Sequence, residues 1–102
     1  MPWFIKTETF TNKTLRLHEE ERKALIARHK SWVMELQSIG RRISSGYLVN
    51  EKQVPGGGGL MIIEATCFEE AKTLVEKDPM ISEGFVKWEL HEWIPLVGKI
   101  IS

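Results

Sequence analysis

The chain has 102 residues, with 14 basic and 14 acidic side chains and a formal net charge of zero. This length allows one hydrophobic core, so we expect residues 1–102 to form a single domain. Balanced charge argues against nucleic-acid and anionic membrane partners, and no apolar run reaches the roughly 18 residues of a membrane span. The lone Cys67 and the lack of a secretory signal predict a reducing, cytoplasmic setting.

Residues 2–10 are rich in aromatic and β-branched side chains and predict a first strand. Its alternation places Phe4, Lys6 and Glu8 on one face and Trp3, Ile5 and Thr7 on the other.

Residues 11–14 predict a turn, after which a long charged helix begins near residues 19–21 and stops at Gly40. The helix carries one apolar stripe that is expected to face a sheet. His29 interrupts this stripe, four residues after Leu25 and three before Trp32. The remaining stripe positions are Val33, Leu36 and Ile39.

Residues 43–49 predict a second strand, with Ser45 on the same face as Ile43. The glycine run at 56–59 predicts a mobile connection, because glycine loses the most backbone freedom when it is ordered. Residues 60–63 are apolar on both faces, which is typical of a strand in the middle of a sheet.

Thr66 and Glu69 have capping-box spacing and predict the start of a second helix. We expect Asp78-Pro79 to end this helix, since the residue before proline avoids helical dihedrals. Residues 80–84 then form a turn, and residues 85–94 form the last strand. The expected buried stripe of the helix is Phe68, Ala71, Leu74 and Val75.

The element order is β-α-β-β-α-β, which connection rules fold into a ferredoxin-like α+β domain. It has a four-stranded antiparallel sheet with both helices on one face. The other face, which also carries apolar side chains, is then uncovered. Large exposed apolar patches are uncommon in monomers, so we predict a homodimer with two sheets packed face to face, a dimeric α/β barrel.

His29 and Asp78 are the candidate catalytic residues. A carboxylate bound to one ring nitrogen would fix the tautomer of the imidazole and stabilise its charged form during proton transfer. Asp78 is the only aspartate in the chain. The structural alternatives are a core histidine bonded to a backbone carbonyl and a helix-ending Asp-Pro turn.

Ser45 and Trp32 are candidate substrate-binding residues, through a hydroxyl hydrogen bond and an aromatic wall. Ser45, His29 and Asp78 also permit a Ser-His-Asp hydrolase, although no nucleophile elbow surrounds the serine. Metal binding is not expected, since the three histidines lack ligand spacing, and no motif predicts a cofactor.

The chain resembles the YciI-like (YCII-related) family. The resemblance rests on the aromatic first strand, His29-x-x-Trp32, Ser45-Gly46, the segments 58–65 and 68–71, Asp78-Pro79-Met80 and the closing strand through Trp93. It implies a dimeric α/β-barrel protein with a His29–Asp78 active-site pair in a cleft near the dimer interface. A few relatives act on ring-cleavage lactones, for example by eliminating chloride.

Two functions therefore remain open. The first is a small-molecule enzyme, an isomerase, lyase or hydrolase of lactones or organic acids, that uses the His-Asp pair for proton transfer. The second is a non-catalytic dimeric protein that binds a small ligand. Proton transfer requires a linked imidazole and carboxylate, whereas simple binding does not.

Overall fold

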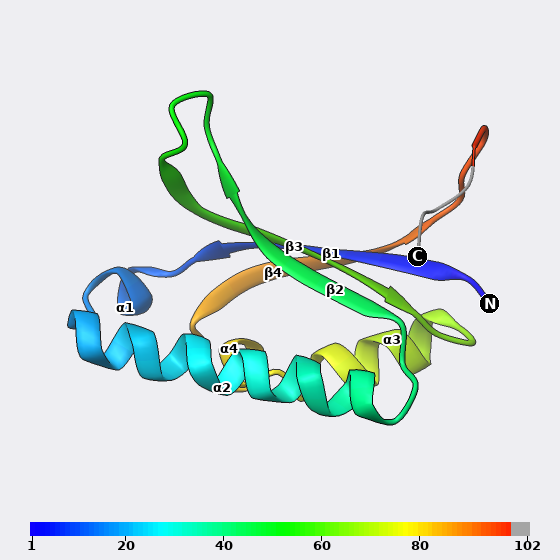
Figure 1. Cartoon of the computed structure of the whole chain (residues 1–102), viewed down its shortest axis with the longest axis horizontal. Coiled ribbons are helices and arrows are strands. Elements are labelled where there is room, and N and C mark those ends of the chain that lie inside the picture. Colours follow the sequence, from blue (N-terminus) through cyan, green and yellow to red (C-terminus); the bar gives the residue numbers. More distant parts are fainter. Residues whose placement is uncertain (99–102) are drawn as a thin grey trace.

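Four strands form one antiparallel sheet in the order β2-β3-β1-β4, and helices cover one of its faces (Figure 1). This computed structural model describes residues 1–98. The ferredoxin-like α+β fold expected from the sequence is confirmed. The elements are β1 (Trp3–Phe10), α1 (Asn12–Leu15), α2 (Glu19–Ser38), β2 (Ile43–Val49), β3 (Pro55–Glu64), α3 (Phe68–Val75), α4 (Pro79–Ser82) and β4 (Val86–Trp93).

The core lies between the sheet and the helices. Alternation along β1 turns Phe4 and Lys6 inward, and both side chains are completely buried. On β4 the inward face carries Val86, Trp88 and Leu90, which pack against the core. The main cluster is completed by Leu36, Ile43, Met61, Ile63, Ala65, Ala71 and Val75.

Within residues 1–98, no helix covers the opposite face of the sheet (Figure 1). Ile5 of β1 pairs with Ile62 of β3 on this face, and both are only partly buried. Trp93 of β4, opposite Trp3, is 39% exposed. The predicted uncovered apolar face is therefore present in the single chain.

The predicted turn at 11–14 is instead part of a short helix, α1. Its N-cap Thr11 and its buried Thr14 are tied to the residue before β4, because both hydroxyls donate to the carbonyl of Phe85. These bonds give the segment a fixed position that local turn patterns cannot reveal.

The glycine run does not form the predicted mobile connection. Residues 56–59 belong to β3, where Gly58 pairs with Thr9 and Gly59 with Glu8 of β1. The connection is shorter, at residues 50–54, and Asn50 closes it by accepting hydrogen bonds from the backbone of Lys52 and Val54. Pairing on both sides overrides the low strand propensity of glycine.

Three helix-end predictions were wrong. Cys67, not Thr66, is the N-cap of α3, and the backbone N–H of Thr66 donates to Glu70 instead of completing a capping box with Glu69. Two predicted core residues at helix boundaries are exposed. Phe68, the first residue of α3, is 40% exposed, and Ile39, which follows α2, is 71% exposed.

Asp78 begins a helix instead of ending one. Helix α3 ends at Val75, and Asp78 is the N-cap of α4, with Pro79 in the first helical turn. Proline suits that position because its missing N–H would have no partner there. The consequence is that the Asp78 side chain is aimed inward and is fully buried.

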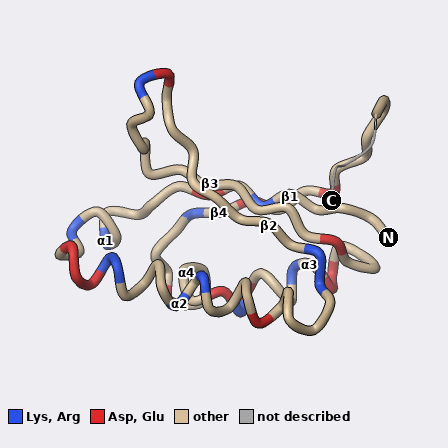
Figure 2. Tube along the Cα trace, in the orientation of Figure 1, with Lys and Arg blue, Asp and Glu red and all other residues tan. Residues whose placement is uncertain are grey.

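Acidic and basic residues are interspersed along the helical layer, and the middle of β2 and β3 carries neither (Figure 2). Within residues 1–98, no helix combines the length and the apolar character needed to cross a bilayer.

Candidate active site

His29 and Asp78, 49 residues apart in the chain, are joined by hydrogen bonds. Both carboxylate oxygens of Asp78 lie 2.9 Å from Nδ1 of His29. The His29 side chain is 13% exposed, whereas that of Asp78 is completely buried. The structure thus brings together the two residues that the sequence predicted as a pair.

Local structure explains why Asp78 can hold this position. As the N-cap of α4, its Oδ1 accepts the backbone N–H of Met80 at 3.0 Å. Because the N-cap residue has an extended backbone, its side chain turns back across the start of the helix toward α2. The hydrogen bond from Met80 therefore fixes the position of the carboxylate independently of His29.

Ser45 lies on the other side of the imidazole. Its Oγ is 2.9 Å from Nε2 of His29, and Ser45 is exposed. β2 positions this hydroxyl, because Ser45 shares the inward face with buried Ile43. The order Ser45–His29–Asp78 forms one continuous hydrogen-bonded chain from the surface to a buried carboxylate.

Proton positions follow from the chemistry of these partners. A carboxylate can only accept, so Nδ1 of His29 is the donor to Asp78. In the neutral ring Nε2 then carries a lone pair, which accepts the hydroxyl proton of Ser45. In the charged ring Nε2 donates to the same oxygen. This arrangement can take up and return a proton at Nε2.

Trp32, the second predicted binding residue, lies beside the histidine on α2. The ring centroids of Trp32 and His29 are 6.0 Å apart, and the planes are inclined by 38°. Trp32 is partly buried against the main core cluster. It therefore borders the histidine while contributing to the packing of the helix.

Lys6 is a charged residue at this site that sequence reasoning missed. Its side chain is completely buried, and Nζ lies 3.6 Å from Oδ2 of Asp78. Nζ also forms an ion pair with Glu8, whose side chain is only 8% exposed. The available signal was the alternation of β1, which places Lys6 on the same face as Phe4.

Gly59 makes room for the Glu8 side chain. A Cβ at Gly59 would lie 3.2 Å from Cγ of Glu8 and 3.1 Å from the carbonyl oxygen of Gly46. Both distances are shorter than ordinary van der Waals contact, so any larger residue requires Glu8 or β2 to shift.

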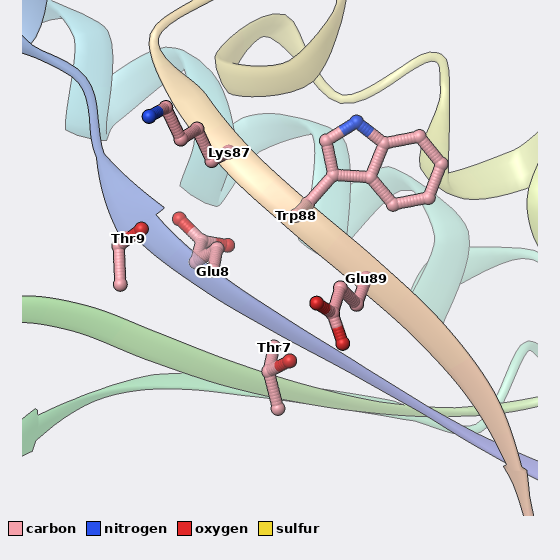
Figure 3. Close-up of a pocket in the computed structure, with 6 residues that line it drawn as sticks. All are labelled: Thr7, Glu8, Thr9, Lys87, Trp88 and Glu89. Carbon is pink, nitrogen blue, oxygen red and sulfur yellow. The ribbon is translucent and has the colours of Figure 1, made fainter.

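A hollow of about 350 Å³ lies on β1 and β4 (Figure 3), and neither His29 nor Asp78 lines it. Of the residues that line the hollow, only Glu8 also belongs to the group of buried charges around Asp78. Figure 3 shows Trp88 directed toward the helices, while Thr7 lies on the other side of the sheet. The hollow is lined by Thr7, Glu8, Thr9, Lys87, Trp88 and Glu89. The cleft expected beside His29 stays a prediction.

An ion pair outside the buried cluster joins the two elements that carry His29 and Asp78. Arg28 of α2 donates from both terminal nitrogens to Glu83, which follows α4. The hydrogen bond from Arg28 lowers the pKa of the Glu83 carboxyl and raises that of the Arg28 guanidinium.

Among residues 1–98, no three His, Cys, Asp or Glu side chains gather as a metal site would require.

Comparison with known proteins gives a family and a fold. Residues 4–94 match the family model of the YCII-related domain. The chain is similar to the solved structure of 5-chloro-2-hydroxyhydroquinone dehydrochlorinase from Burkholderia phenoliruptrix, in complex with 2,5-dihydroxybenzoquinone. That similarity has a TM-score of 0.66 and 20% identity, and covers 90% of this chain and 93% of the other.

A second similar structure is a dimeric ferredoxin-like protein from an uncultured marine organism. It has a TM-score of 0.50 and 18% identity, with coverage of 97% of this chain and 100% of the other. The sequence has no match among curated proteins. At these identities the two structures establish the fold alone.

Proposed function

The chain belongs to the YCII-related domain family, and on that premise we propose that it is a small-molecule enzyme in which His29 and Asp78 transfer a proton. The substrates we propose are small cyclic organic acids, lactones and related ring compounds. The reaction is an isomerisation, an elimination or a hydrolysis. The supporting observation is the hydrogen-bonded chain Ser45–His29–Asp78.

In this proposal Nε2 of His29 is the general base. For an elimination, Nε2 removes a proton from the substrate, the freed electron pair forms the new double bond, and the leaving group departs with its own electron pair. The resulting imidazolium faces Asp78, which lowers the energy of the charged ring. For an isomerisation, the same nitrogen returns the proton at a different atom.

Ser45 has two candidate roles in this scheme. It either orients a substrate oxygen, or relays the proton between substrate and Nε2. Its exposed hydroxyl is the surface end of the chain, so a substrate reaches Ser45 without opening the core. Trp32, beside the histidine, provides an apolar wall for a ring.

The second candidate function is ligand binding without catalysis. The hydrogen bond between Ser45 and His29 favours it, because Nε2 already has a partner in the free protein. In that case Ser45 and His29 hold a ligand by hydrogen bonds, and no proton is transferred to or from the ligand.

We further propose a homodimer formed through the uncovered sheet face. Ile5, Ile62 and Trp93 lie on that face and are incompletely buried in the single chain. Packing two such faces removes apolar area from water, which favours association by about 25 cal/mol per Å² before the entropy cost of binding.

The experiment uses the compounds named for the similar dehydrochlorinase. Binding of 2,5-dihydroxybenzoquinone and chloride release from 5-chloro-2-hydroxyhydroquinone are measured for the parent, His29→Gln and His18→Gln. His18 is an exposed histidine at the start of α2 and serves as the matched control. Chloride release that disappears only in His29→Gln supports the enzyme. Binding without release supports the second candidate.

A further inference from the structure

We propose that Lys6 and Glu8 are positioning residues that set the charge on the Asp78–His29 pair. They lie two residues apart on β1 and point to the same face of the sheet, toward the helices. This inference rests on the proposed function only for its catalytic consequence. The electrostatic coupling itself is a property of the free protein.

The surroundings of Lys6 leave its ammonium few partners. Its cross-strand neighbours are the apolar Met61 and Leu90, and its side chain has no exposed area. A buried ammonium requires compensating charge. Nζ finds it in Glu8 on its own strand and in Asp78, 3.6 Å away. One ammonium is thus shared between two carboxylates.

The cluster is not neutral while His29 is uncharged. Lys6 contributes one positive charge, and Glu8 and Asp78 contribute two negative charges, so the formal sum is −1. Protonation of His29 brings the sum to zero. Each carboxylate therefore favours the imidazolium, and Lys6 opposes it.

Among residues 1–98, Lys6 is the charged side chain paired with Asp78, and Glu8 is paired with Lys6. Arg22, two turns before His29 on α2, is partly buried, but its guanidinium donates to the backbone carbonyl of Leu17. β2 contributes the neutral Ser45, and α4 contributes Asp78 through its N-cap. Arg28 and Glu83 pair with each other on the exposed side of α2 and α4. Lys6 and Glu8 are thus the residues whose replacement changes the field on the pair without removing a hydrogen bond from His29.

Glu8 is held in place by its fit over Gly59. The Glu8 side chain lies where a Cβ of residue 59 would come within 3.2 Å of it. A glycine here lets the carboxylate lie against β3 and reach Lys6. Residue 59 therefore takes part in positioning the cluster through packing alone.

The chain contains a matched control for these charges. Lys87 and Glu89 on β4 have the same spacing as Lys6 and Glu8, and β4 is paired with β1. Both are exposed and lie on the opposite face of the sheet from the helices, which is the face of the proposed dimer, so sedimentation of both control variants accompanies the titration. Substitutions there change the same charges at the same spacing, but outside the buried cluster.

The test is the titration midpoint of His29, measured by histidine NMR in the substrate-free protein. In Lys6→Met the two carboxylates lose their shared cation, so the midpoint is expected to rise by about half a pH unit or more. In Glu8→Gln a negative charge is lost and Lys6 serves Asp78 alone, so the midpoint is expected to fall by about as much. Lys87→Met and Glu89→Gln leave it within about 0.2 units.

The two variants are expected to shift the titration midpoint of His29 in opposite directions. A general loss of packing would shift the midpoint in the same direction in both variants. If Lys6→Met does not fold, the sign in Glu8→Gln decides, and the double variant Lys6→Met/Glu8→Gln removes both charges without leaving Glu8 unpaired. Shifts of equal sign, or none beyond the controls, overturn the proposal. Opposite shifts with no chloride release retain the positioning role and reject the elimination of chloride as the reaction.

Discussion

The carboxylate of Asp78 holds the imidazole of His29 through Nδ1, with both oxygens 2.9 Å from that nitrogen. The carboxylate is itself fixed by the backbone of Met80 and by the charge of Lys6. Ser45 bonds the opposite ring nitrogen. The ring is thus held from both sides, and the two sides differ: one is buried and only accepts, and the other reaches the surface.

Replacing Ser45 separates a relay or orienting residue from a nucleophile. Ser45→Ala removes one neutral hydrogen bond, worth about 1 kcal/mol, so we expect turnover to fall by about fivefold. A serine nucleophile would lose on the order of a thousandfold or more. Ser45→Thr keeps a hydroxyl and is the matched control. Steady-state rates of the three proteins distinguish the roles.

Gly59→Ala is expected to destabilise the fold. The added Cβ would meet the carbonyl oxygen of Gly46 at 3.1 Å as well as the Glu8 side chain. Overpacking of this kind costs about 1–3 kcal/mol of the free energy of unfolding. Gly56→Ala, where a Cβ meets nothing within 4 Å, is expected to change it by less than about 0.5 kcal/mol. Urea unfolding measures both, and equal effects would contradict the close fit.

Charging Trp93 is expected to break the proposed dimer. Trp93→Glu places a carboxylate on the uncovered sheet face, whereas Glu69→Lys alters an exposed position on α3. Sedimentation at micromolar concentration should give a dimer for the parent and Glu69→Lys, and a monomer for Trp93→Glu. A parent protein that sediments as a monomer would remove the basis for this interface.

Stability should depend on pH through Glu83. Its hydrogen bond with Arg28 lowers its pKa in the folded state, so the carboxylate stabilises the fold above the ordinary glutamate range. That stabilisation is lost as pH falls through the lowered folded-state pKa. The difference in unfolding free energy between the parent and Glu83→Gln should therefore be present at neutral pH and vanish in acid. A difference that grows in acid would have the wrong sign.

The order of strands and helices was predictable, because each has a clear hydrophobic period and the connections restrict the topology. The contact between His29 and Asp78 was also predictable, because a histidine on an apolar helix stripe requires a hydrogen-bonding partner. The predicted end of α3 at Asp78 was wrong because aspartate before proline suits a helix start as well as a stop. Only the fold selects between them.

Lys6 was not predictable as a buried charge. Both faces of β1 carry apolar side chains, so alternation could not decide whether Phe4 or Trp3 faces the helices. If Phe4 faces the helices, strand alternation makes Lys6 face them too, and its buried ammonium then requires compensating negative charge. Those partners, Glu8 and Asp78, come from one neighbouring position and one 72 residues away, and no local pattern links them.

The measurement that tests the proton-transfer site most directly is the tautomer of neutral His29, read from the ¹⁵N shifts of its two ring nitrogens. We expect a proton on Nδ1 and a lone pair on Nε2, because the carboxylate of Asp78 can only accept. In Asp78→Asn, where the amide can also donate, this preference should weaken, while His18 and His91 remain unchanged as internal controls. A proton on Nε2 in the parent protein would contradict the account, since that nitrogen could then no longer act as the base.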